Sequence, residues 1–505
     1  MWHLFGQTSF NLAFCCYIHH QFFNCALVPG GRFSNSPTSQ SPVRSCHFYT
    51  PLMRQTFLIV SLLISLISWG QTPHLQGTMN LDIPKGLITC QFTFSNTSSK
   101  SSYTILLNSG FNLKYFKQGD KLLDNTTKDN SGKKEYELYS SAEDTVALKS
   151  VEGVTIFYIG AFPAYTTDSI TGDDMGAIAI KNNILRATVQ SVFIPELVDR
   201  ITKKHLTSYT YDITVNCSRT ETVYLNGSAP QTGKTLHFVN NSPLDFLIYA
   251  GKYKVQHQNN LYLLNTNLDK KYVDVLAKAT EQISQFYSKN MGIAYDANVV
   301  FPQIFSIGPK NQYAKWAFTV TPTIVMDVNE LSSKIDLKTQ TINDPNTFRI
   351  IAHEMAHKYF MQLLNAAGTR NLWRFYHETL AEYLAFKAVE NILSPTIYKE
   401  QLIKYKFTDK NKAASFPTFD EIENSEKDLT NASYNYYPLY LIGFEKMFGI
   451  DKTFKLLRQL VLDKDQFTFD AEYFKSTILK IGITQQDFEK YKAAFLNSTN
   501  CNNQF

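Results

Sequence analysis

Hydrophobic periodicity divides the chain into two parts, and this division constrains the fold more than any other feature. Between residues 76 and 256, short runs alternate apolar with polar residues and are separated by Asn, Gly and Ser, as in LITCQFTFSN, TIFYIGAF and YTYDITVNCS. Runs of this period that are rich in Val, Ile, Thr, Tyr and Phe are typical of strands. They predict an N-terminal antiparallel β domain of sandwich type over residues 71–256.

After Leu268 the apolar residues recur at helical spacing instead. The segment KKYVDVLAKATEQISQFYSKNMG predicts a helix that ends at Gly292. Two strand-like pieces follow, NVVFPQIFSIG and PTIVMDV, and the C-terminal part reads as helices joined by short loops. We therefore expect a second domain over residues 257–505, mixed α/β at first and then helical, and a multidomain α+β chain.

Two of these predicted helices lie next to each other in the sequence. The first lies within the segment 344–368, with Asp344 or Asn346 near its N-cap and Gly368 just past its end. The second covers residues 371–393 and stops before Pro395. They are expected to pack as an antiparallel pair joined by a loop around Gly368.

Charge and composition exclude one large class of function. The chain has 505 residues, 44% of them hydrophobic, and its 49 Lys and Arg against 44 Asp and Glu give a net charge of only +5. The basic residues form no block, so we expect no nucleic-acid partner.

The strongest apolar run near the N-terminus begins after Met53, in MRQTFLIVSLLISLISWGQTP. Arg54 is followed by 12 apolar-rich residues at 57–68 and by small residues before Gln71, which is the layout of a signal peptide at 53–70. A membrane span needs about 20 apolar residues. We interpret residues 1–52 as an upstream extension and expect an exported protein, secreted, periplasmic or at the cell surface. A membrane-anchored form requires that the 57–68 segment stays uncleaved.

Cleavage after Gly70 would leave three cysteines, namely Cys90, Cys217 and Cys501. In an oxidising compartment this number permits one internal disulfide, for which Cys90 with Cys217 is a candidate, and leaves one thiol over.

The segment RIIAHEMAHKYF, residues 349–360, carries the chemistry. On a helix, His353 and His357 lie one turn apart on the same face, where two imidazoles can bind one zinc ion with Glu354 beside them. A chance match to this HExxH pattern in about 500 residues has a probability on the order of 1%. The alternative is a core helix with two histidines that bind no metal.

A catalytic zinc ion needs a third protein ligand and an open position for water. Glu378 on the second helix, with 20 residues between it and His357, is the expected third ligand. Glu382 lies four residues later and is either a hydrogen-bond acceptor for a ligand histidine or the rival third ligand. His377 points about 100° away from Glu378 on a regular helix, which suggests a position outside the ligand set or on the surface.

IIAHEMAHKYF followed by HETLAEYLA resembles the gluzincin metallopeptidases of the aminopeptidase N family, in which AHELAHQWF is followed by NEGFAEYLA. Their usual spacing is 18 residues instead of 20. The resemblance implies a thermolysin-like catalytic domain after a β domain, one zinc ion, a peptide or protein substrate, and Glu354 as the general base.

The family also has a downstream tyrosine that stabilises the oxyanion of the tetrahedral intermediate. NASYNYYPLYLIGFEKMFG matches that place, and Tyr434 aligns with the family tyrosine, with Tyr436 and Tyr437 as close competitors. In the implied mechanism zinc activates water and polarises the scissile carbonyl while Glu354 moves the proton.

Two departures from the family affect the expected substrate. The aminopeptidases carry a GAMEN box whose Glu binds the free α-amine, and KWAFTVTPTIVMDVNEL has no acidic residue at that place, because Asp327 and Glu330 come too late. The chain also extends only 71 residues beyond Tyr434, which is short for the large helical domain of longer members. An aminopeptidase-like exopeptidase, a secreted endopeptidase acting on extended peptides, and a non-catalytic zinc-containing scaffold therefore stay open.

Overall fold

The computed structural model describes residues 72–98, 101–165, 178–302, 318–326, 328–364, 370–407, 416–463 and 470–498. The chain separates into two units, Met1–Trp69 and Gly70–Phe505, and all described residues belong to the second. The expected upstream extension, the expected signal peptide and Cys501 lie outside the described residues.

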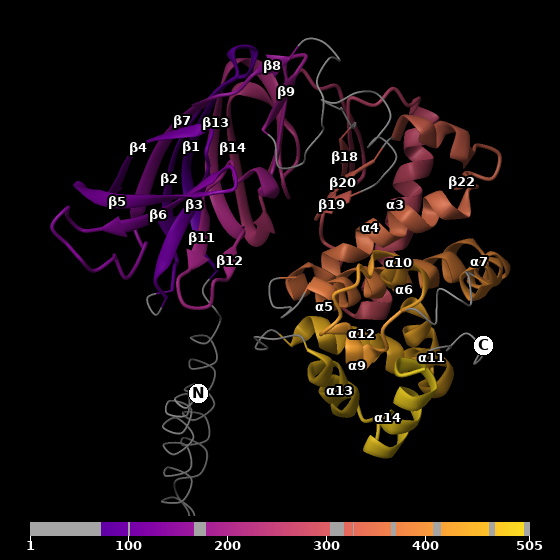
Figure 1. Cartoon of the computed structure of the whole chain (residues 1–505). Coiled ribbons are helices and arrows are strands. Elements are labelled where there is room, and N and C mark those ends of the chain that lie inside the picture. Colours follow the sequence, from indigo (N-terminus) through magenta and orange to yellow (C-terminus); the bar gives the residue numbers. More distant parts are fainter. Residues whose placement is uncertain are drawn as a thin grey trace, which may run out of the picture. The chain divides into compact units, whose positions relative to one another are not determined.

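In the described part of the chain, the N-terminal region forms one sheet of 15 strands (Figure 1). Fourteen of them have the order β12-β11-β3-β6-β5-β4-β7-β2-β1-β13-β15-β10-β9-β8. The remaining strand, β14, pairs with β13 as a branch outside this order. The strands are β1 (His74–Asp82), β2 (Leu87–Ser95), β3 (Tyr103–Asn108), β4 (Phe111–Gln118), β5 (Lys121–Asn130), β6 (Lys133–Tyr139), β7 (Val154–Ala161), β8 (Ala164–Tyr165), β9 (Ala179–Lys181), β10 (Ile184–Thr188), β11 (Glu196–Asp199), β12 (His205–Leu206), β13 (Ser208–Leu225), β14 (Gln231–Asp245) and β15 (Leu247–Gly251).

The sheet curls around a single hydrophobic core. Alternate residues of β2 are buried, as its sequence pattern predicts. The same core contains Ile105 and Leu197 from one end of the strand order and Ile213 from β13, which is far from them in that order. The Tyr209 hydroxyl on β13 also accepts a hydrogen bond from the backbone N–H of Leu197 on β11, at 3.0 Å. The expected sandwich is therefore one sheet curled on itself.

The expectation of a purely antiparallel domain is wrong at two ladders. β1 runs parallel to β13, from His74 opposite Thr210 to Leu81 opposite Cys217, and β8 runs parallel to β9. β1 and β13 are far apart in the sequence, so no hairpin imposes an antiparallel direction on them.

The expected disulfide between Cys90 and Cys217 is absent, and both thiols are buried and free. Cys90 on β2 lies opposite Met79 of β1, and Cys217 on β13 lies opposite Leu81 of the same strand. β1 therefore separates them, and two strand spacings amount to about 9.6 Å. A disulfide cannot join Cα atoms more than about 7 Å apart.

The expected domain boundary at residue 256 falls inside β16 (Val255–Gln258), which belongs to a second sheet. DFLIYAGKYKVQ reads as one strand, but the chain turns at Gly251, where φ is +143°. A Cβ atom at this position would lie 2.3 Å from the carbonyl oxygen of Asn183, so the turn requires glycine.

The second sheet has the order β16-β17-β18-β20-β19 among the described residues. Its other strands are β17 (Leu261–Leu264), β18 (Val299–Pro302), β19 (Phe318–Val320) and β20 (Thr323–Val325). The helix α3 (Lys270–Met291) ends at Gly292, whose φ of +60° is left-handed, as the sequence predicts. A short ladder of β21 (Ile335–Asp336) and β22 (Thr341–Ile342) precedes the next helix.

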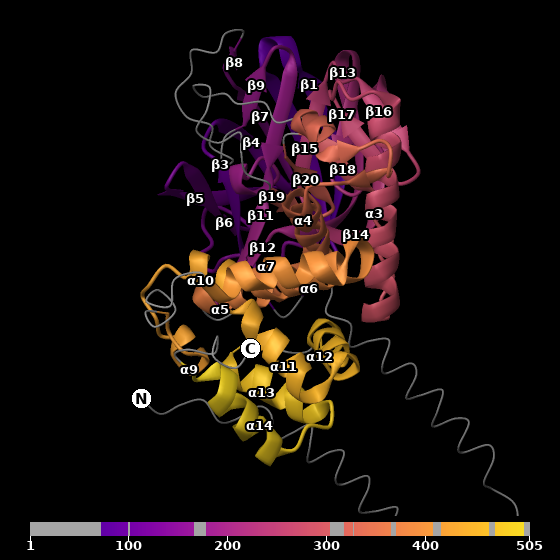
Figure 2. The same ribbon diagram turned by 90° about the vertical axis from the view of Figure 1, so that its right-hand side faces the viewer.

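Helices make up the rest of the described chain (Figure 2). The predicted pair is confirmed: α4 begins after Asp344, whose carboxylate accepts the backbone N–H of Thr347 at 3.2 Å, and the second helix ends before Pro395. The helical segments are α4 (Pro345–Leu364), α5 (Arg370–Arg374), the π-helical turn η4 (Phe375–Thr379), α6 (Leu380–Ala388), the π-helical turn η5 (Val389–Leu393), α7 (Pro395–Phe407), α9 (Phe419–Ile422), α10 (Thr430–Asn435), α11 (Pro438–Phe448), α12 (Ile450–Leu462), α13 (Ala471–Lys480), α14 (Gln485–Tyr491) and η6 (Lys492–Leu496).

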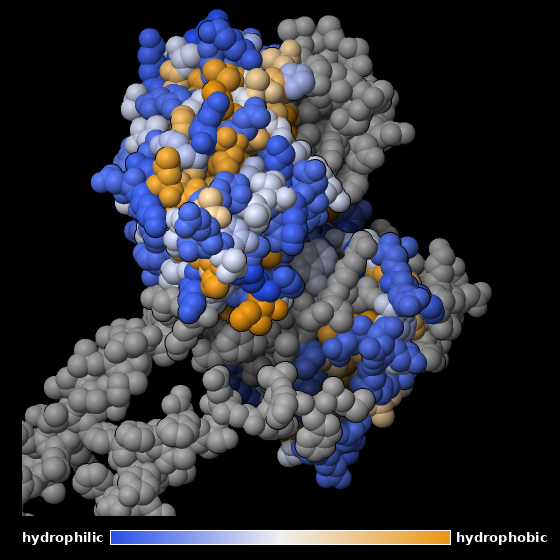
Figure 3. Space-filling view, turned by 60° about the vertical axis from the view of Figure 1, so that its left-hand side comes forward, coloured by the Kyte–Doolittle hydropathy of each residue, from blue (hydrophilic) through white to orange (hydrophobic). Residues whose placement is uncertain are grey.

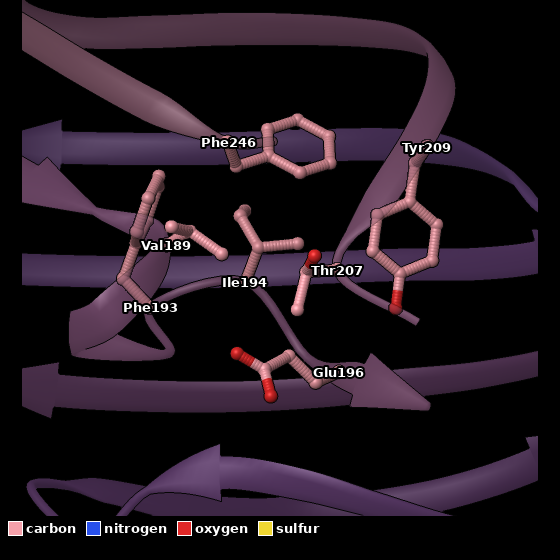
Figure 4. A pocket seen from close by; sticks show the side chains of 7 residues that line it. All are labelled: Val189, Phe193, Ile194, Glu196, Thr207, Tyr209 and Phe246. Carbon is pink, nitrogen blue, oxygen red and sulfur yellow. The ribbon is translucent and has the colours of Figure 1, made fainter. Parts of the chain in front are cut away.

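The β domain contains a cavity of about 10 Å³, which holds at most one water molecule (Figure 4). It is lined by Val189, Phe193, Ile194, Glu196, Thr207, Tyr209 and Phe246. Apolar residues on the face shown in Figure 3 are interspersed with hydrophilic ones. Among the described helices, none combines the length and the apolar character that a membrane crossing requires.

Candidate metal centre

Helix α4 brings three polar side chains of the HExxH segment to one buried face. His353, Glu354 and His357 are 5%, 9% and 3% exposed. The hydroxyl of Tyr287 on α3 donates to the carbonyl of Ala352 at 2.8 Å, which ties the neighbouring helix to the turn that carries His353. The two imidazole rings lie with their centroids 4.7 Å apart, as expected for positions one turn apart.

Glu378 comes from the second helix of the predicted pair, where it lies in the π-helical turn η4. Its Oε2 lies 3.2 Å from Nε2 of His353 and 3.6 Å from Nε2 of His357. One ligand atom from each of the three residues can be chosen so that all lie within 4.8 Å of one another. The structure thus brings together the three residues that the sequence predicts as metal ligands.

These distances fit a tetrahedral zinc ion. Bonds of about 2.05 Å at tetrahedral angles hold two ligand atoms about 3.3 Å apart, which is close to both observed separations. In the described part of the chain, the ion pairs of Glu354 and Glu378 are with histidines alone. Buried carboxylates without a permanent cation are costly, so a divalent cation suits both the shape and the charge of this site.

The surroundings shift the pKa values of these groups in opposite directions. Burial alone would lower the pKa of His353, but the hydrogen bonds that its imidazole donates to the carboxylates of Glu378 and Glu382 raise it to about 10. Burial would raise the pKa of Glu378, but the imidazoles of His357 and His353 lower it well below its usual range, so Glu378 stays ionised as a ligand must. Burial raises the pKa of Glu354, which brings this carboxylate towards the range of a general base.

No protein-family model and no curated protein matches this chain. Two solved structures are similar to it. The structure of native yeast LTA4 hydrolase matches with a TM-score of 0.55 and 12% identity, over 84% of this chain and 66% of that one. The structure of yeast LTA4 hydrolase in complex with bestatin gives 0.55 and 13%, over 85% and 66%.

The chain has the fold of LTA4 hydrolase. The match includes the large curled sheet and the helical C-terminal region. At 12–13% identity the match shows a similarity of fold alone. The chain spans slightly less than two thirds of the length of its structural neighbour.

Geometry distinguishes the three competing tyrosines. Tyr434 on α10 donates from its hydroxyl to Oε2 of Glu378 at 2.6 Å, the oxygen that faces both ligand histidines. Tyr436 instead bonds to the carbonyl of Ser498 at 3.0 Å and Tyr437 to that of Pro417 at 3.1 Å. Tyr434 is thus the one of the three whose hydroxyl reaches the ligand cluster.

Glu382 faces away from the converging ligand atoms. Its Oε2 accepts from Nδ1 of His353 at 2.8 Å, and its Oε1 pairs with the guanidinium of Arg349. This geometry matches the hydrogen-bonding role that the sequence predicts and argues against Glu382 as the third ligand. The sequence analysis does not predict that Arg349 pairs with Glu382. Arg349 lies four residues before His353, and this spacing places both side chains on the same face of α4.

Of the two positions expected for His377, outside the ligand set beside the ligands or on the surface, the structure shows the first and excludes the second. His377 is buried, its ring stacks on that of His357, and its Nδ1 lies 3.2 Å from Oε1 of Glu378. The expectation assumed regular α-helical rotation, whereas the π-helical turn widens the helix at this point.

Proposed function

We propose that this protein is a zinc-dependent hydrolase of peptide bonds, similar to aminopeptidase N. The observation that carries the proposal is the convergence of His353, His357 and Glu378, with Glu354 and Tyr434 at the same point. The fold shared with LTA4 hydrolase supports the coarser statement that the chain is a hydrolase. The cluster of His353, His357 and Glu378 on this fold supports the more specific proposal, zinc-dependent hydrolysis of peptide bonds.

Each side chain has a distinct role in the proposed reaction. The imidazoles of His353 and His357 and the carboxylate of Glu378 would hold a zinc ion. When bound, zinc lowers the pKa of a water molecule and polarises a carbonyl group.

Glu354 and Tyr434 act on the substrate side of this site. The Glu354 carboxylate, 3.9 Å from Nε2 of His357, accepts the proton of the attacking water and gives it to the leaving amine. The hydroxyl of Tyr434 stays protonated, because burial and the Glu378 carboxylate raise its pKa, and donates to the developing oxyanion.

A zinc-dependent cleavage screen of peptide libraries, read by mass spectrometry, tests this function. We expect turnover that a chelator abolishes and that zinc restores, and that Glu354→Gln lacks. Zinc binding without cleavage of any peptide would leave the non-catalytic scaffold instead. Absence of zinc binding would contradict the proposal altogether.

An endopeptidase is the second candidate, and the strands near the site favour it. The described residues at the place of the GAMEN box, β19, the turn after it and β20, contain no acidic residue. A substrate ammonium group therefore has no charge-assisted partner on these residues. A free-amine peptide and its N-acetylated form separate the two candidates, because an exopeptidase discriminates strongly against the blocked end.

A further inference from the structure

Three aromatic rings form a continuous stack beside the candidate zinc ligands. The ring of His377 lies over that of His357, with centroids 3.8 Å apart and planes 10° apart. The indole of Trp373 stacks on His377 as well, with centroids 5.2 Å apart and planes 17° apart. The imidazole of His357 is therefore stacked on that of His377, which is itself stacked on the indole of Trp373.

His377 also touches a second ligand through its edge. Its Nδ1 lies 3.2 Å from Oε1 of Glu378, whereas Oε2 of the same carboxylate faces His353 and His357. Because an ionised carboxylate only accepts hydrogen bonds, Nδ1 of His377 must carry the proton that is donated to Glu378. His377 thus fixes the plane of the His357 ring and the rotation of the Glu378 carboxylate.

His357 needs such support because its outer nitrogen has no hydrogen-bond partner. Nδ1 of His353 is held by Glu382 at 2.8 Å, the usual arrangement for a metal-binding histidine. Nδ1 of His357 is buried and makes no hydrogen bond within the described residues. The parallel stack with His377 and the edge contact with His353 then fix the orientation of the His357 imidazole.

The position of His377 also has a cost that a packing role alone does not explain. Its Nε2 is buried without a hydrogen-bond partner among the described residues, and leaving a buried polar group unsatisfied is unfavourable. A phenylalanine would fill this space and stack without that cost. An asparagine could bond to Glu378 but would not stack. Histidine provides both contacts.

We infer that His377 is a positioning residue that orients His357 and Glu378 together and so sets the zinc affinity of the site. The inference rests on the proposed zinc site. It requires no contact between His377 and either the substrate or the metal.

Zinc affinity, measured by competition with a chelator of known affinity, tests the inference directly. Loss of an outer contact to a metal ligand weakens affinity by about 10- to 100-fold, and we expect this for His377→Ala, which loses both contacts. His377→Phe keeps the stack and loses the bond to Glu378, so its affinity should fall by a smaller factor of about 10. Trp373→Leu should weaken binding less than His377→Ala does.

A matched control comes from a second histidine stack outside the site. His257 lies on the ring of Tyr262, at 4.2 Å and 13°, in the hairpin of β16 and β17, and His257→Phe should bind zinc like the unaltered protein. The visible spectrum of the cobalt-substituted protein should change in both His377 variants, because it reports the ligand geometry, and should not change in the control.

Thermal unfolding of the metal-free variants separates folding defects from effects on the site. If His377→Ala does not fold, His377→Phe alone decides, since it preserves the volume of the ring. Variants that fold and bind zinc within twofold of the unaltered protein, with the same cobalt spectrum, would overturn the inference and leave the proposed function intact. An unaltered protein that binds no zinc would overturn both.

Discussion

Glu382 receives the Nδ1 hydrogen of His353 at 2.8 Å while its other oxygen pairs with the guanidinium of Arg349. The Glu382 carboxylate is completely buried, and the hydrogen bond from His353 and the ion pair with Arg349 offset the cost of removing its charge from water. This bond fixes the orientation of the His353 ring, so that Nε2 faces Glu378 and His357.

Replacing Glu382 by Gln should weaken zinc binding without removing a ligand. The amide keeps the shape of the side chain but loses the charge, so both His353 and Arg349 lose a charge-assisted bond. We expect zinc affinity to fall by about 10- to 100-fold, measured by chelator competition. Glu281→Gln on the exposed face of α3 is the control. An unchanged affinity would remove Glu382 from the metal centre.

Glu354→Gln should separate metal binding from turnover. The amide cannot accept the proton of water, so kcat should fall by about 10²- to 10⁴-fold. Zinc content, determined by atomic spectroscopy on dialysed protein, should stay at one ion per chain. Turnover close to that of the unaltered protein would mean that another group is the base.

Tyr434→Phe should lower kcat by about 10²- to 10³-fold, the usual effect of removing one donor to an oxyanion. Tyr436→Phe is its matched control, because that hydroxyl bonds to the carbonyl of Ser498 and not to the site. The two variants differ only in which hydroxyl is lost from one short segment. Equal rates for both would exclude Tyr434 from the reaction.

Asn226→Ala should destabilise the protein away from the site. Asn226 lies just after β13 and donates to the carbonyls of Thr321 and Asp245, each at 2.9 Å. Alanine would leave both carbonyls without this partner, and the free energy of unfolding should fall by about 2–4 kcal/mol. Differential scanning calorimetry should show a lower Tm. Asn216→Ala, whose side chain bonds to Asn80 at the sheet surface, should change stability by no more than about 0.5 kcal/mol.

Cys90 and Cys217 should be unreactive in the folded protein. Burial raises the pKa of the Cys90 thiol to about 12 and that of Cys217 to about 11. A raised pKa depletes the reactive thiolate below it, so at pH 8 only about one Cys90 in 10⁴ is ionised. Iodoacetamide should label both only after denaturation. A cross-linked Cys90–Cys217 peptide in a non-reducing digest would contradict the structure.

The sequence was sufficient where one local pattern determines the outcome. Period-two alternation indicated the strands, Asp344 and Gly292 marked helix ends, and the HExxH spacing placed His353 and His357 on one face. It was insufficient where distant strands meet. The parallel ladder of β1 with β13, and hence the separation of the two cysteines, depends on a pairing over more than a hundred residues that no local pattern encodes.

His377 shows a different limit. Its placement required the rotation per residue around Glu378, and a helical wheel supplies only the regular α-helical value. Nothing in the letters FYHET indicates the wider hydrogen bonding of a π-helical turn. The nitrogens of His357 and His377 that have no hydrogen-bond partner in the described part of the chain are likewise a property of the packed molecule.

The π-helical turn at Phe375–Thr379 makes the length of the chain a determinant of the site. If one residue were deleted there, the segment could wind as a regular α-helix with all its backbone bonds intact, yet every side chain on one flank would swing by about 100° relative to the other. The Glu378 carboxylate and the His377 ring would then face different neighbours. We therefore expect this protein to tolerate many substitutions near the turn more readily than any change in the number of residues within it.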